Sequence, residues 1–459
     1  MTGVNREVTR GGGTDRFDPG PFVPGAKTRP RVAVIANAPA PYRLAQHTRI
    51  VRELPEIELL TVFKHEHNNS PWKNPLPEEI NPVVFGRGER MTEKNKGMNT
   101  LRQWGRGGAL IGFLKRHKVD LVIITGYNDL GLLRTIRWCR SAGVPCFMFN
   151  DSNKYGDRAT GPAKAFKKAY VPFVLKSLTG LMPCGRNGVD YFRPYGFPGG
   201  PAFYMPHEPA YGLLSELTDE FVAQKRAEHG LRDDLRYINY CARMVNVKRP
   251  DLLIDAFTTI ADDRPGWGVC FVGGGELLDA MRERVPVHLR DRVVFTGFVD
   301  GSKNVSALYK ACEIHCLPST YEPWAAVIPE AAAAGLAIVS SHVVGAAAEC
   351  VRDDVNGYLF ESGNADDLAQ KLLRATDDSN VMRLKAGSAE VIRDWRTRGD
   401  PVDAVRRACE MTSVLEPRSG RKPMGDLDRD WKIDAEKGVN ALSLLERADD
   451  DASVGTRTT

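Results

Sequence analysis

With 459 residues, 42% of them hydrophobic and 26% charged, the chain has the composition of an ordinary globular protein, and its length predicts two domains with tails. Its net charge of +5 is small for this length and argues against a nucleic-acid-binding protein with a broad basic face. The nine cysteines form no Cys-x-x-Cys pair, and the sequence shows neither a signal-peptide core nor a spanning apolar stretch, so we expect a cytoplasmic protein with reduced thiols.

The first half of the chain alternates apolar strands with helices. Residues 1–29 are rich in Gly, Pro and charge, and we expect them to be disordered. A helix is predicted from about 42 to 54. The predicted strands lie at 31–37, 57–63, 120–126, 145–150, 180–185 and 202–206. This alternation predicts a doubly wound α/β domain over 30–206, with a mostly parallel sheet covered on both faces.

The second half repeats this pattern after a polar segment of helical pattern, 207–235, which we expect to be a linker. The predicted strands lie at 237–244, 268–274, 292–298, 313–319, 337–341 and 357–360. They predict a second doubly wound domain over 236–395, followed by a helix at 396–415 that packs back toward the first domain and a polar tail at 416–459. Two such domains enclose a cleft at the carboxyl ends of their sheets, where ligands of open α/β sheets bind.

Two glutamates carry the most specific signal. The segment YEPWAAVIPEAAAAG places Glu322 and Glu330 eight residues apart, after a predicted buried strand. We expect Glu322 on a loop and Glu330 near the start of a helix, whose first amides would face an anion. Carboxylates also accept hydrogen bonds from vicinal hydroxyl groups. The segment therefore predicts a site for an anion and for hydroxyl groups.

Two cations and a glycine turn precede the glutamates. Arg243 and Lys248 come just after the strand segment YINYCA, 237–242, where a diphosphate leaving group would need positive charge, although two solvated cations would look the same in isolation. A run of three glycines, 273–275, follows another strand and leaves room for backbone to approach a ligand, although a plain strand-to-helix turn is the alternative.

The Glu pair, the Arg–Lys pair and the glycine turn together resemble the signature of family 4 retaining glycosyltransferases. The likeness is strong over about 237–365, looser over 31–205 and absent in the tails. It implies the GT-B architecture, in which two Rossmann-like domains face a central cleft. It also implies transfer of a sugar from a nucleoside diphosphate sugar to an acceptor hydroxyl with retention of configuration, without a required metal or other cofactor.

The resemblance assigns roles residue by residue. It places Glu322 against the donor sugar and Glu330 against the ribose, and it implies no side-chain nucleophile. The catalytic residues that it implies are Glu322, Arg243 and Lys248. The donor-binding residues that it implies are Arg243, Lys248, Gly273, Gly274, Gly275, Gly297, Phe298, Glu322, Ala325, Ala326, Val327 and Glu330, with the base read through backbone near Gly297 and Phe298.

The sequence departs from the family at two places. Many relatives have Gly-Phe-Gly after the first glutamate, where this chain has Pro323, Trp324 and Ala325. Many have Gly-Gly and then Glu after the next strand, where this chain has Val344–Ala346 and only later Glu349. We expect these changes to reshape the sugar pocket, which leaves the donor sugar open.

Residues after strands of the first domain are candidates for contact with the acceptor. The Pro-Tyr-Arg turn after the first strand, which family 4 proteins often have, also fits a helix start with a solvated arginine. Turn chemistry alone explains Asn and Asp after later strands equally well, although Asp151 could act as a base toward an acceptor hydroxyl. The acceptor-side candidates are Tyr42, Arg43, Tyr127, Asn128, Asp151 and Ser152.

Three patterns suggest other chemistry. Cys312, His315 and Cys316 could suggest a metal, but they lie in a predicted buried strand whose side chains alternate in direction. The Asp-x-Asp at 426–430 lies in the polar tail and fits a solvated charge run. The segment 163–176 mixes Lys with Phe and Tyr at helical spacing and fits either a solvated face or peripheral contact with the inner face of an anionic membrane.

The expected partners are thus a nucleotide-sugar donor and a glycan, lipid-linked or small-molecule acceptor, with no nucleic acid. Two other functions remain open. The altered segments at 323–325 and 344–346 fit a catalytically weak relative that binds nucleotide sugars or acts as an assembly subunit. A sugar-nucleotide epimerase would use the same architecture, whereas a phosphorylase would need a cofactor-lysine context that is not apparent.

Overall fold

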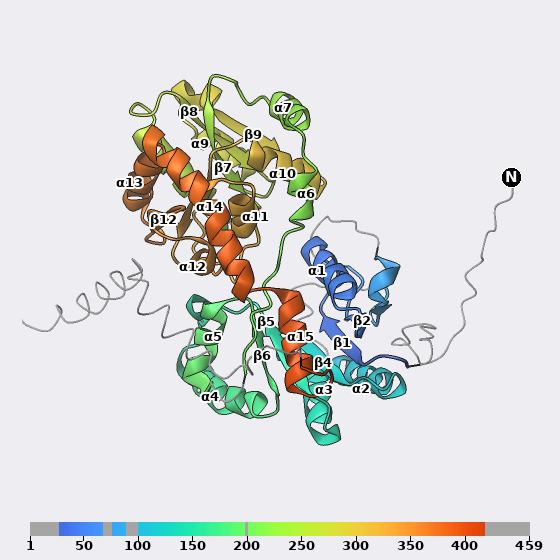
Figure 1. Ribbon diagram of the computed structural model, residues 1–459. Helices are drawn as coiled ribbons and strands as arrows, with labels where there is room; N and C mark the ends of the chain where they lie inside the picture. Colours follow the sequence, from blue (N-terminus) through green and yellow to red (C-terminus); the bar gives the residue numbers. More distant parts are fainter. Residues whose placement is uncertain (1–26, 68–75, 89–99, 198–200, 418–459) are drawn as a thin grey trace, which may run out of the picture. The chain divides into compact units, whose positions relative to one another are not determined.

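A computed structural model describes residues 27–67, 76–88, 100–197 and 201–417, and it contains two six-stranded sheets (Figure 1). The first sheet has the order β3-β2-β1-β4-β5-β6. Its strands are β1 (Arg31–Ala36), β2 (Glu58–Phe63), β3 (Pro82–Val84), β4 (Leu121–Thr125), β5 (Cys146–Asn150) and β6 (Gly180–Pro183). The recorded pairings in this sheet, such as β1 with β2 and β5 with β6, are parallel.

The second sheet has the order β12-β11-β10-β7-β8-β9, and its pairings are parallel as well. Its strands are β7 (Arg236–Cys241), β8 (Trp267–Val272), β9 (Val293–Gly297), β10 (Ile314–Leu317), β11 (Ala337–Ser341) and β12 (Gly357–Phe360). β8, β10, β11 and β12 are buried along their whole length, as apolar runs in a sheet covered on both faces should be. The predicted α/β class with two doubly wound sheets is confirmed.

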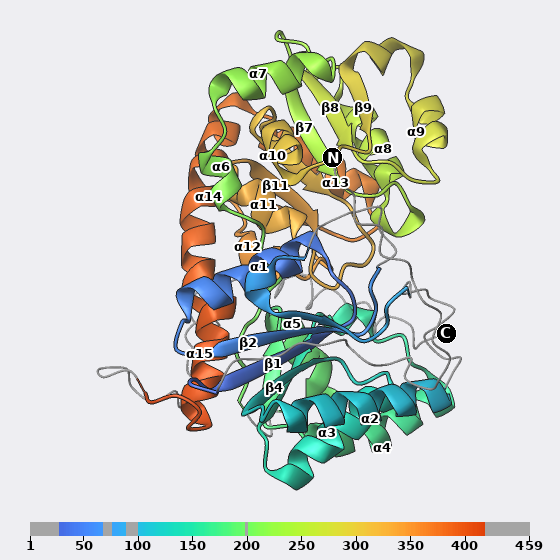
Figure 2. The ribbon, with the colours of Figure 1, turned by 90° about the vertical axis from the view of Figure 1, so that its right-hand side faces the viewer.

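Helices connect the strands. In the first half they are α1 (Pro41–Glu53), α2 (Thr100–Arg116), α3 (Leu130–Ala142), α4 (Gly161–Leu175), α5 (Arg186–Phe192), α6 (Gly212–Ser215) and α7 (Asp219–Glu228). In the second half they are α8 (Pro250–Ile260), α9 (Leu278–Arg284), α10 (Ser302–Lys310), α11 (Val327–Ala333), α12 (Ala347–Cys350), α13 (Ala365–Ala375), α14 (Asp378–Arg398) and α15 (Pro401–Met411). Figure 2 shows α1 on one side of β1, β2 and β4, with α2 and α3 on the other.

Local sequence signals set the helix ends. α3 begins at Asp129, whose carboxylate accepts from the amides of Gly131 and Leu132, and ends at Gly143 in the left-handed conformation. α14 begins at Asp377, whose side chain accepts from Ser379 and Asn380.

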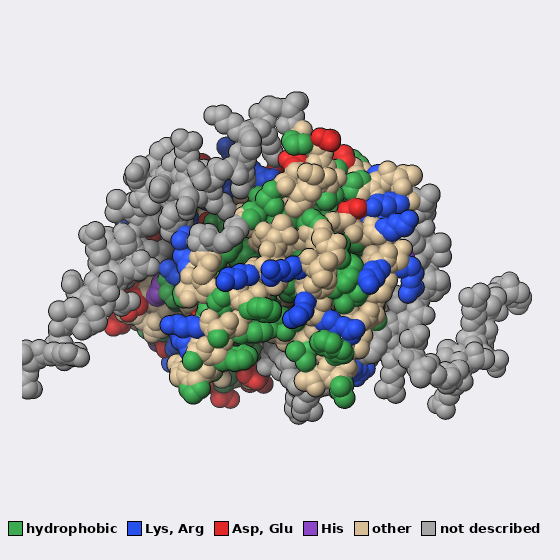
Figure 3. Space-filling model, turned by 90° about the horizontal axis from the view of Figure 1, so that it is seen from below, with side chains coloured by type: hydrophobic (Ala, Val, Ile, Leu, Met, Phe, Trp, Pro, Cys, Tyr) green, Lys and Arg blue, Asp and Glu red, His purple; other side chains and the backbone are tan. Residues whose placement is uncertain are grey.

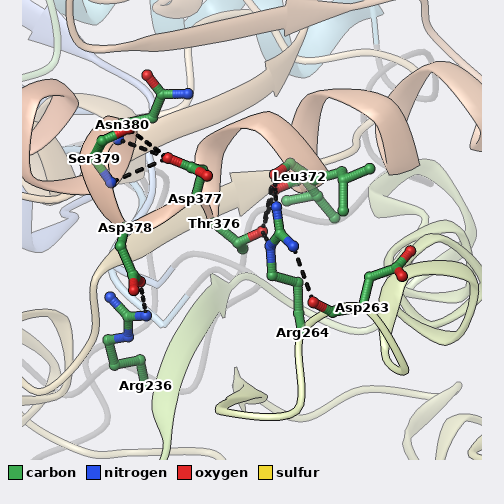
Figure 4. A network of polar contacts seen from close by, with 10 residues as sticks. Arg236, Asp263, Arg264, Leu372, Thr376, Asp377, Asp378, Ser379 and Asn380 are labelled. Carbon is green, nitrogen blue, oxygen red and sulfur yellow. Dashed lines mark hydrogen bonds and ion pairs between the residues drawn. The ribbon is translucent and has the colours of Figure 1, made fainter.

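The turn between α13 and α14 is held by an arginine (Figure 4). Arg264 donates to the Thr376 hydroxyl over 3.0 Å and to the Leu373 carbonyl over 2.9 Å. The Leu373 carbonyl lies in the last turn of α13, where carbonyls lack intrahelical partners, so the arginine satisfies a group that the end of the helix exposes.

By their internal contacts, the residues divide into two compact units. One comprises residues up to Val51 with Pro55–Cys146, and the other comprises Arg52–Leu54 with Phe147 onward. β5 from Phe147 onward, β6 and the whole second sheet therefore belong to the second unit. The boundaries inferred from sequence at 206, 236 and 395 stay predictions, as does the packing of the helix at 396–415.

Two strand predictions differ from the structure. The segment 202–206 is not a strand, although it runs beside β6 with a parallel bridge between Ala202 and Leu181, and the amides of Phe203 and Met205 donate to the carbonyls of Leu181 and Pro183. β3 was not predicted, since three residues give no readable alternation. Most of the predicted tails at 1–29 and 416–459, and the Asp-x-Asp at 426–430, lie outside the described residues.

Candidate functional site

The loop between β10 and α11 holds Glu322. This side chain is buried, and its carboxylate forms an ion pair with the ammonium group of Lys248. Oε1 of Glu322 also lies 3.4 Å from the Ser319 hydroxyl, which donates to it. A buried carboxylate requires such partners, so Glu322 and Lys248 hold each other in place.

Lys248 ends a short 3-10 helix, Asn246–Lys248, that follows β7. Burial and the neighbouring Arg243 lower the pKa of Lys248 to about 8, whereas the Cys241 thiol acts in the opposite direction. Arg243 itself is exposed, and within the described part of the chain its guanidinium forms no ion pair. The end of β7 thus presents one sequestered cation and one accessible cation.

Glu330 lies in the first turn of α11, as predicted, and is partly buried. The Tyr309 hydroxyl, from α10, donates to its Oε2 over 3.1 Å. Burial raises the pKa of Glu330 to about 7, and the hydrogen bond from Tyr309 acts in the opposite direction. This carboxyl is therefore poised between its neutral and ionised forms near neutral pH.

The turn before α11 has an unusual backbone. Ala325 has a φ of 75°, in the region that favours glycine. Among the residues that the structure describes, the amides of Ala325, Ala326 and Val327 donate to no carbonyl or side chain. Three N–H groups at a helix start are a local source of positive potential for an anion.

The glycine turn after β8 can only be built from glycine. Gly273 has a φ of 134° and Gly275 a φ of 153°, and a Cβ would lie 2.2 Å from the Ala242 oxygen or 2.4 Å from the Met244 oxygen, respectively. Gly274 lies beside Phe298, whose ring is 54% exposed. The turn is therefore pressed against the loop after β7, a packing role that explains its composition without reference to a ligand.

Backbone hydrogen bonds link all of these loops. The Gly273 amide donates to Gly297 over 2.9 Å, and the Met244 amide donates to Gly274 over 2.9 Å. The Thr320 amide donates to Val247 over 2.9 Å. The candidates on the second sheet are thus brought together at its carboxyl edge, on loops that follow β7, β8, β9 and β10.

Asn153, which sequence reasoning did not single out, binds the backbone of the Glu322 loop. It is completely buried, and its side-chain amide donates to the carbonyls of Glu322 (2.9 Å) and Val343 (2.8 Å). The Gly345 amide donates to the same Glu322 carbonyl. A polar residue after β5 gives no sequence signal for this contact because its partners are 169 and 190 residues away.

The two departures from the family pattern have packing roles. The Trp324 indole is buried and donates to the His207 carbonyl over 2.9 Å, with its ring 5.6 Å from that of Trp395. The Glu349 side chain is fully buried and accepts from the backbone and guanidinium of Arg186, with Oε1 2.7 Å and 3.1 Å from the two nitrogens. Neither side chain makes a described contact with Glu322 or Glu330.

The acceptor-side candidates divide between the units. Tyr42 and Arg43 begin α1, and Tyr127 and Asn128 follow β4, all in the first unit. Asp151 and Ser152 follow β5 in the second unit, where Asp151 is exposed with its Oδ2 3.9 Å from His207 Nε2. Each candidate thus follows the carboxyl end of a strand of the first sheet, and their roles stay predictions.

A buried charged cluster in the first unit was not predicted. Lys64, directly after β2, lies 3.1 Å from Asp129, whose other oxygen caps α3. Burial lowers the pKa of Lys64, with Arg106 acting in the same direction and Asp129 against it. A single lysine after an apolar strand offers no pattern that predicts such a pair.

The supposed metal motif at Cys312, His315 and Cys316 is buried around β10. His315 Nδ1 lies 2.9 Å from Asn239 Oδ1, and burial lowers the pKa of His315 to about 3. Across the described ranges, no group of three or more potential metal-binding side chains is found. Of the helices that the structure describes, none has the length and hydropathy needed to cross a bilayer.

Comparison with known sequences gives partial matches. Residues 221–390 match the sequence model of the family Glycosyl transferases group 1. An uncharacterized glycosyltransferase of Methanocaldococcus jannaschii is 32% identical over 154 residues, 33% of this chain and 39% of the relative. The D-inositol 3-phosphate glycosyltransferase of Mycobacteroides abscessus is 32% identical over 169 residues, 35% of this chain and 36% of the relative. The matched parts thus span about two fifths of these relatives' length.

Comparison with solved structures covers more of the chain. Sucrose-phosphate synthase from Thermosynechococcus elongatus superposes with a TM-score of 0.65 at 16% identity, over 84% of this chain and 100% of that one. Anabaena HepE, solved in complex with UDP and glucose, superposes with a TM-score of 0.62 at 18% identity and the same coverage. At these identities the likeness establishes the fold, which is the predicted GT-B architecture of two Rossmann-like sheets.

Proposed function

We propose that this protein is a retaining glycosyltransferase of the family 4 kind, which transfers a sugar from a nucleoside diphosphate sugar to an acceptor hydroxyl. The observation that carries the proposal is the linked set of loops at the carboxyl edge of the second sheet. These loops present the cations Arg243 and Lys248, the carboxylates Glu322 and Glu330, and the amides at the start of α11. The family match over 221–390 covers all of them.

The leaving group would be held by positive charge supplied by the chain itself. In our proposal, Arg243, Lys248 and the amides of residues 325–327 surround the diphosphate, so a metal ion is not required. Lys248 is already largely withdrawn from water, so little further desolvation is needed when phosphate replaces the Glu322 carboxylate as its partner.

The two carboxylates would recognise hydroxyl groups. Once Lys248 turns to the diphosphate, Glu322 is free to accept from the hydroxyls of the donor sugar, and ionised Glu330 accepts from the ribose. The glycine turn and the exposed ring of Phe298 would lie against the nucleotide, with Gly297 near the base. The site supplies position and charge stabilisation, and the leaving phosphate assists removal of the acceptor proton.

The acceptor would be a glycan, a lipid-linked sugar or a small molecule, and a cytoplasmic location stays a prediction. The solved structure of HepE contains UDP and glucose, so UDP sugars are the first donors to test. A catalytically weak nucleotide-sugar-binding subunit is the alternative, because the Pro-Trp-Ala segment differs from the family pattern.

The test is nucleotide release from a panel of donors that vary in base and sugar, with calorimetry of the free diphosphates. We expect at least one donor to be turned over in the presence of EDTA. Arg243→Ala and Lys248→Ala should each weaken diphosphate binding by about 1.5–3 kcal/mol, the range for charge-assisted hydrogen bonds. Binding without release would favour the subunit, whereas no binding of any nucleotide would refute the proposed site.

A further inference from the structure

α4 presents an apolar surface to solvent. Phe166 is 67% exposed and Phe173 is 57% exposed, and they are seven residues apart, so they lie on one side of the helix. The Phe166 ring stacks on Tyr170, with centroids 5.5 Å apart and planes 12° from parallel. Exposed aromatic side chains grouped on one helix face are typical of surfaces that bind something apolar.

The charge around this face is all of one sign. From Arg158 to Val189 the sequence contains no Asp or Glu. α4 and its C-terminal cap carry four lysines, of which Lys168 and Lys176 are exposed. α4 is labelled in Figure 1, and the view in Figure 3 shows lysine and arginine side chains among hydrophobic ones. Lys176, three residues after Phe173, lies beside it on the helix, and Lys168 lies at the opposite edge of the exposed side.

The buried side of α4 is anchored to the rest of its unit. Lys167 lies 2.6 Å from Asp157 and 2.5 Å from the Tyr191 hydroxyl, and Asp157 also accepts from the Tyr195 hydroxyl. Val171 and Val174 are buried on the same side of the unit. Lys167 is thus used for anchoring, which distinguishes it from Lys168 and Lys176. A preformed helix binds a surface without paying the entropy of folding.

We propose that α4 docks the protein on an anionic lipid surface, with Phe166 and Phe173 inserted among the lipids and Lys168 and Lys176 against the headgroups. A helix with aromatic residues on one face and lysines at its edges lies in the plane of such an interface. A symmetric contact between two copies of α4 would place lysines against lysines, which disfavours self-association as the use of this face.

Vesicle sedimentation of the full chain tests this, with phosphatidylcholine alone and mixed with phosphatidylglycerol. The wild type should bind the mixed vesicles, bind neutral ones much less, and dissociate as salt is raised. Removing charge at Lys168 or Lys176 should weaken binding about fivefold for each lysine. The double variant Phe166→Ser/Phe173→Ser should weaken it about tenfold or more because apolar insertion is lost.

Two matched controls separate α4 from general surface effects. Met382, on α14, is 64% exposed, and Arg393 is an exposed cation on the same helix. Met382→Ser and Arg393→Glu should leave vesicle binding unchanged. Mixed vesicles should slow hydrogen exchange at residues 161–176 of the wild type. This measurement does not depend on whether a variant folds.

Three outcomes would overturn the proposal. The first is that the wild-type protein does not bind anionic vesicles. The second is an α4 variant that binds as well as its control, which would place any contact elsewhere. The third is a dimer that Phe166→Ser converts to monomer, which would make a second copy the occupant of this face.

Discussion

Lys248 and Glu330 are ionisable side chains that change charge near neutral pH, and both lie in the proposed donor site. Burial lowers the pKa of Lys248 to about 8 and raises that of Glu330 to about 7. Lys248 therefore carries its positive charge below about pH 8, and Glu330 carries its negative charge above about pH 7. The form proposed to bind the donor, with both groups ionised, predominates between these values.

Donor affinity should accordingly be greatest between about pH 7 and pH 8. Below this window Glu330 gains a proton and accepts fewer hydrogen bonds from ribose, and above it Lys248 loses the charge that holds the diphosphate. Calorimetry should use an intact nucleoside diphosphate sugar, whose phosphate diesters do not titrate here. An affinity that stays constant across the window and about one pH unit on either side would contradict the assignment.

Tyr309 should determine the pH below which donor affinity falls. Tyr309→Phe removes the hydroxyl that donates to Glu330, so the pKa of Glu330 should rise and the loss of affinity at low pH should begin at higher pH. A hydrogen bond to a charged group contributes about 1.5–3 kcal/mol, which corresponds to about one to two pH units. Tyr358→Phe, which removes a similar bond to Asp354 over 2.8 Å, is the control and should leave the profile in place. An unchanged acid limb in Tyr309→Phe would mean that this hydroxyl does not position Glu330.

The two glutamates should respond differently to the same substitution. Glu322→Gln should depress sugar transfer without weakening the free nucleoside diphosphate, because that ligand lacks the sugar and the substitution releases Lys248 from its ion pair. Glu330→Gln should weaken the free diphosphate and the donor alike, because ribose is present in both. Calorimetry and transfer rates on both variants decide the matter, and the same pattern for both would refute the division of roles.

Glycine turns and short connecting segments, more than whole helices, position the proposed site. The loops after β7, β8, β9 and β10 hydrogen-bond to one another through Gly273, Gly274 and Thr320. The turn after β8 lies so close to the loop after β7 that a single Cβ would displace it. The positions of Arg243 and Lys248 therefore depend on glycines that need not touch a ligand.

Gly275→Ala should destabilise the fold and weaken diphosphate binding together. The added Cβ would lie 2.4 Å from the Met244 oxygen, at a φ of 153° that alanine rarely adopts, so we expect a loss of about 1–3 kcal/mol in unfolding free energy. Gly266→Ala is the matched control, because a Cβ there meets nothing within 4 Å. Chemical denaturation and calorimetry measure both effects. Normal stability and affinity in Gly275→Ala would show that the turn can yield without disturbing the cations.

The whole chain contains two units, each with sheet strands and buried apolar side chains of its own, and the proposed nucleotide contacts all lie in the second. Binding that stabilises one unit by mass action need not stabilise the other. The candidates in the first unit, Tyr42, Arg43, Tyr127 and Asn128, are instead expected to meet the acceptor. The other acceptor-side candidates, Asp151 and Ser152, lie in the second unit, so we expect the first unit to contact the acceptor and not the nucleotide.

Hydrogen exchange should reveal this separation. A nucleoside diphosphate should slow exchange in the loops at 242–248, 273–277 and 319–328 and leave the strands and helices of 31–142 unchanged. The comparison is made on the full chain with and without ligand, and adenosine alone serves as a control that lacks the diphosphate. If only the first unit were protected, the nucleotide would bind there, and the proposed donor site on the second sheet would be wrong.

Much of the fold and part of the site could be predicted from the sequence. Apolar runs such as those of β8 and β10 identified their strands because burial on both faces of a parallel sheet leaves a continuous hydrophobic signature. Glu322 and Glu330 were recognisable because loop and helix start are adjacent in sequence. The hydrogen bond from the Trp324 indole to the His207 carbonyl, by contrast, could not be predicted, and the expected effect of Trp324 on the sugar pocket stays a prediction.

The sequence by itself thus determined the α/β class and most of the strands, and it indicated the residues that we propose bind a nucleotide sugar. Only the tertiary structure decided that Lys248 pairs with Glu322, that Tyr309 donates to Glu330 and that Asn153 holds the Glu322 loop. The reason is that periodicity and turn chemistry act between neighbouring residues, whereas these contacts join residues from separate elements. Their burial, and hence the pKa values near neutrality, exists only once the sheets and helices have packed together.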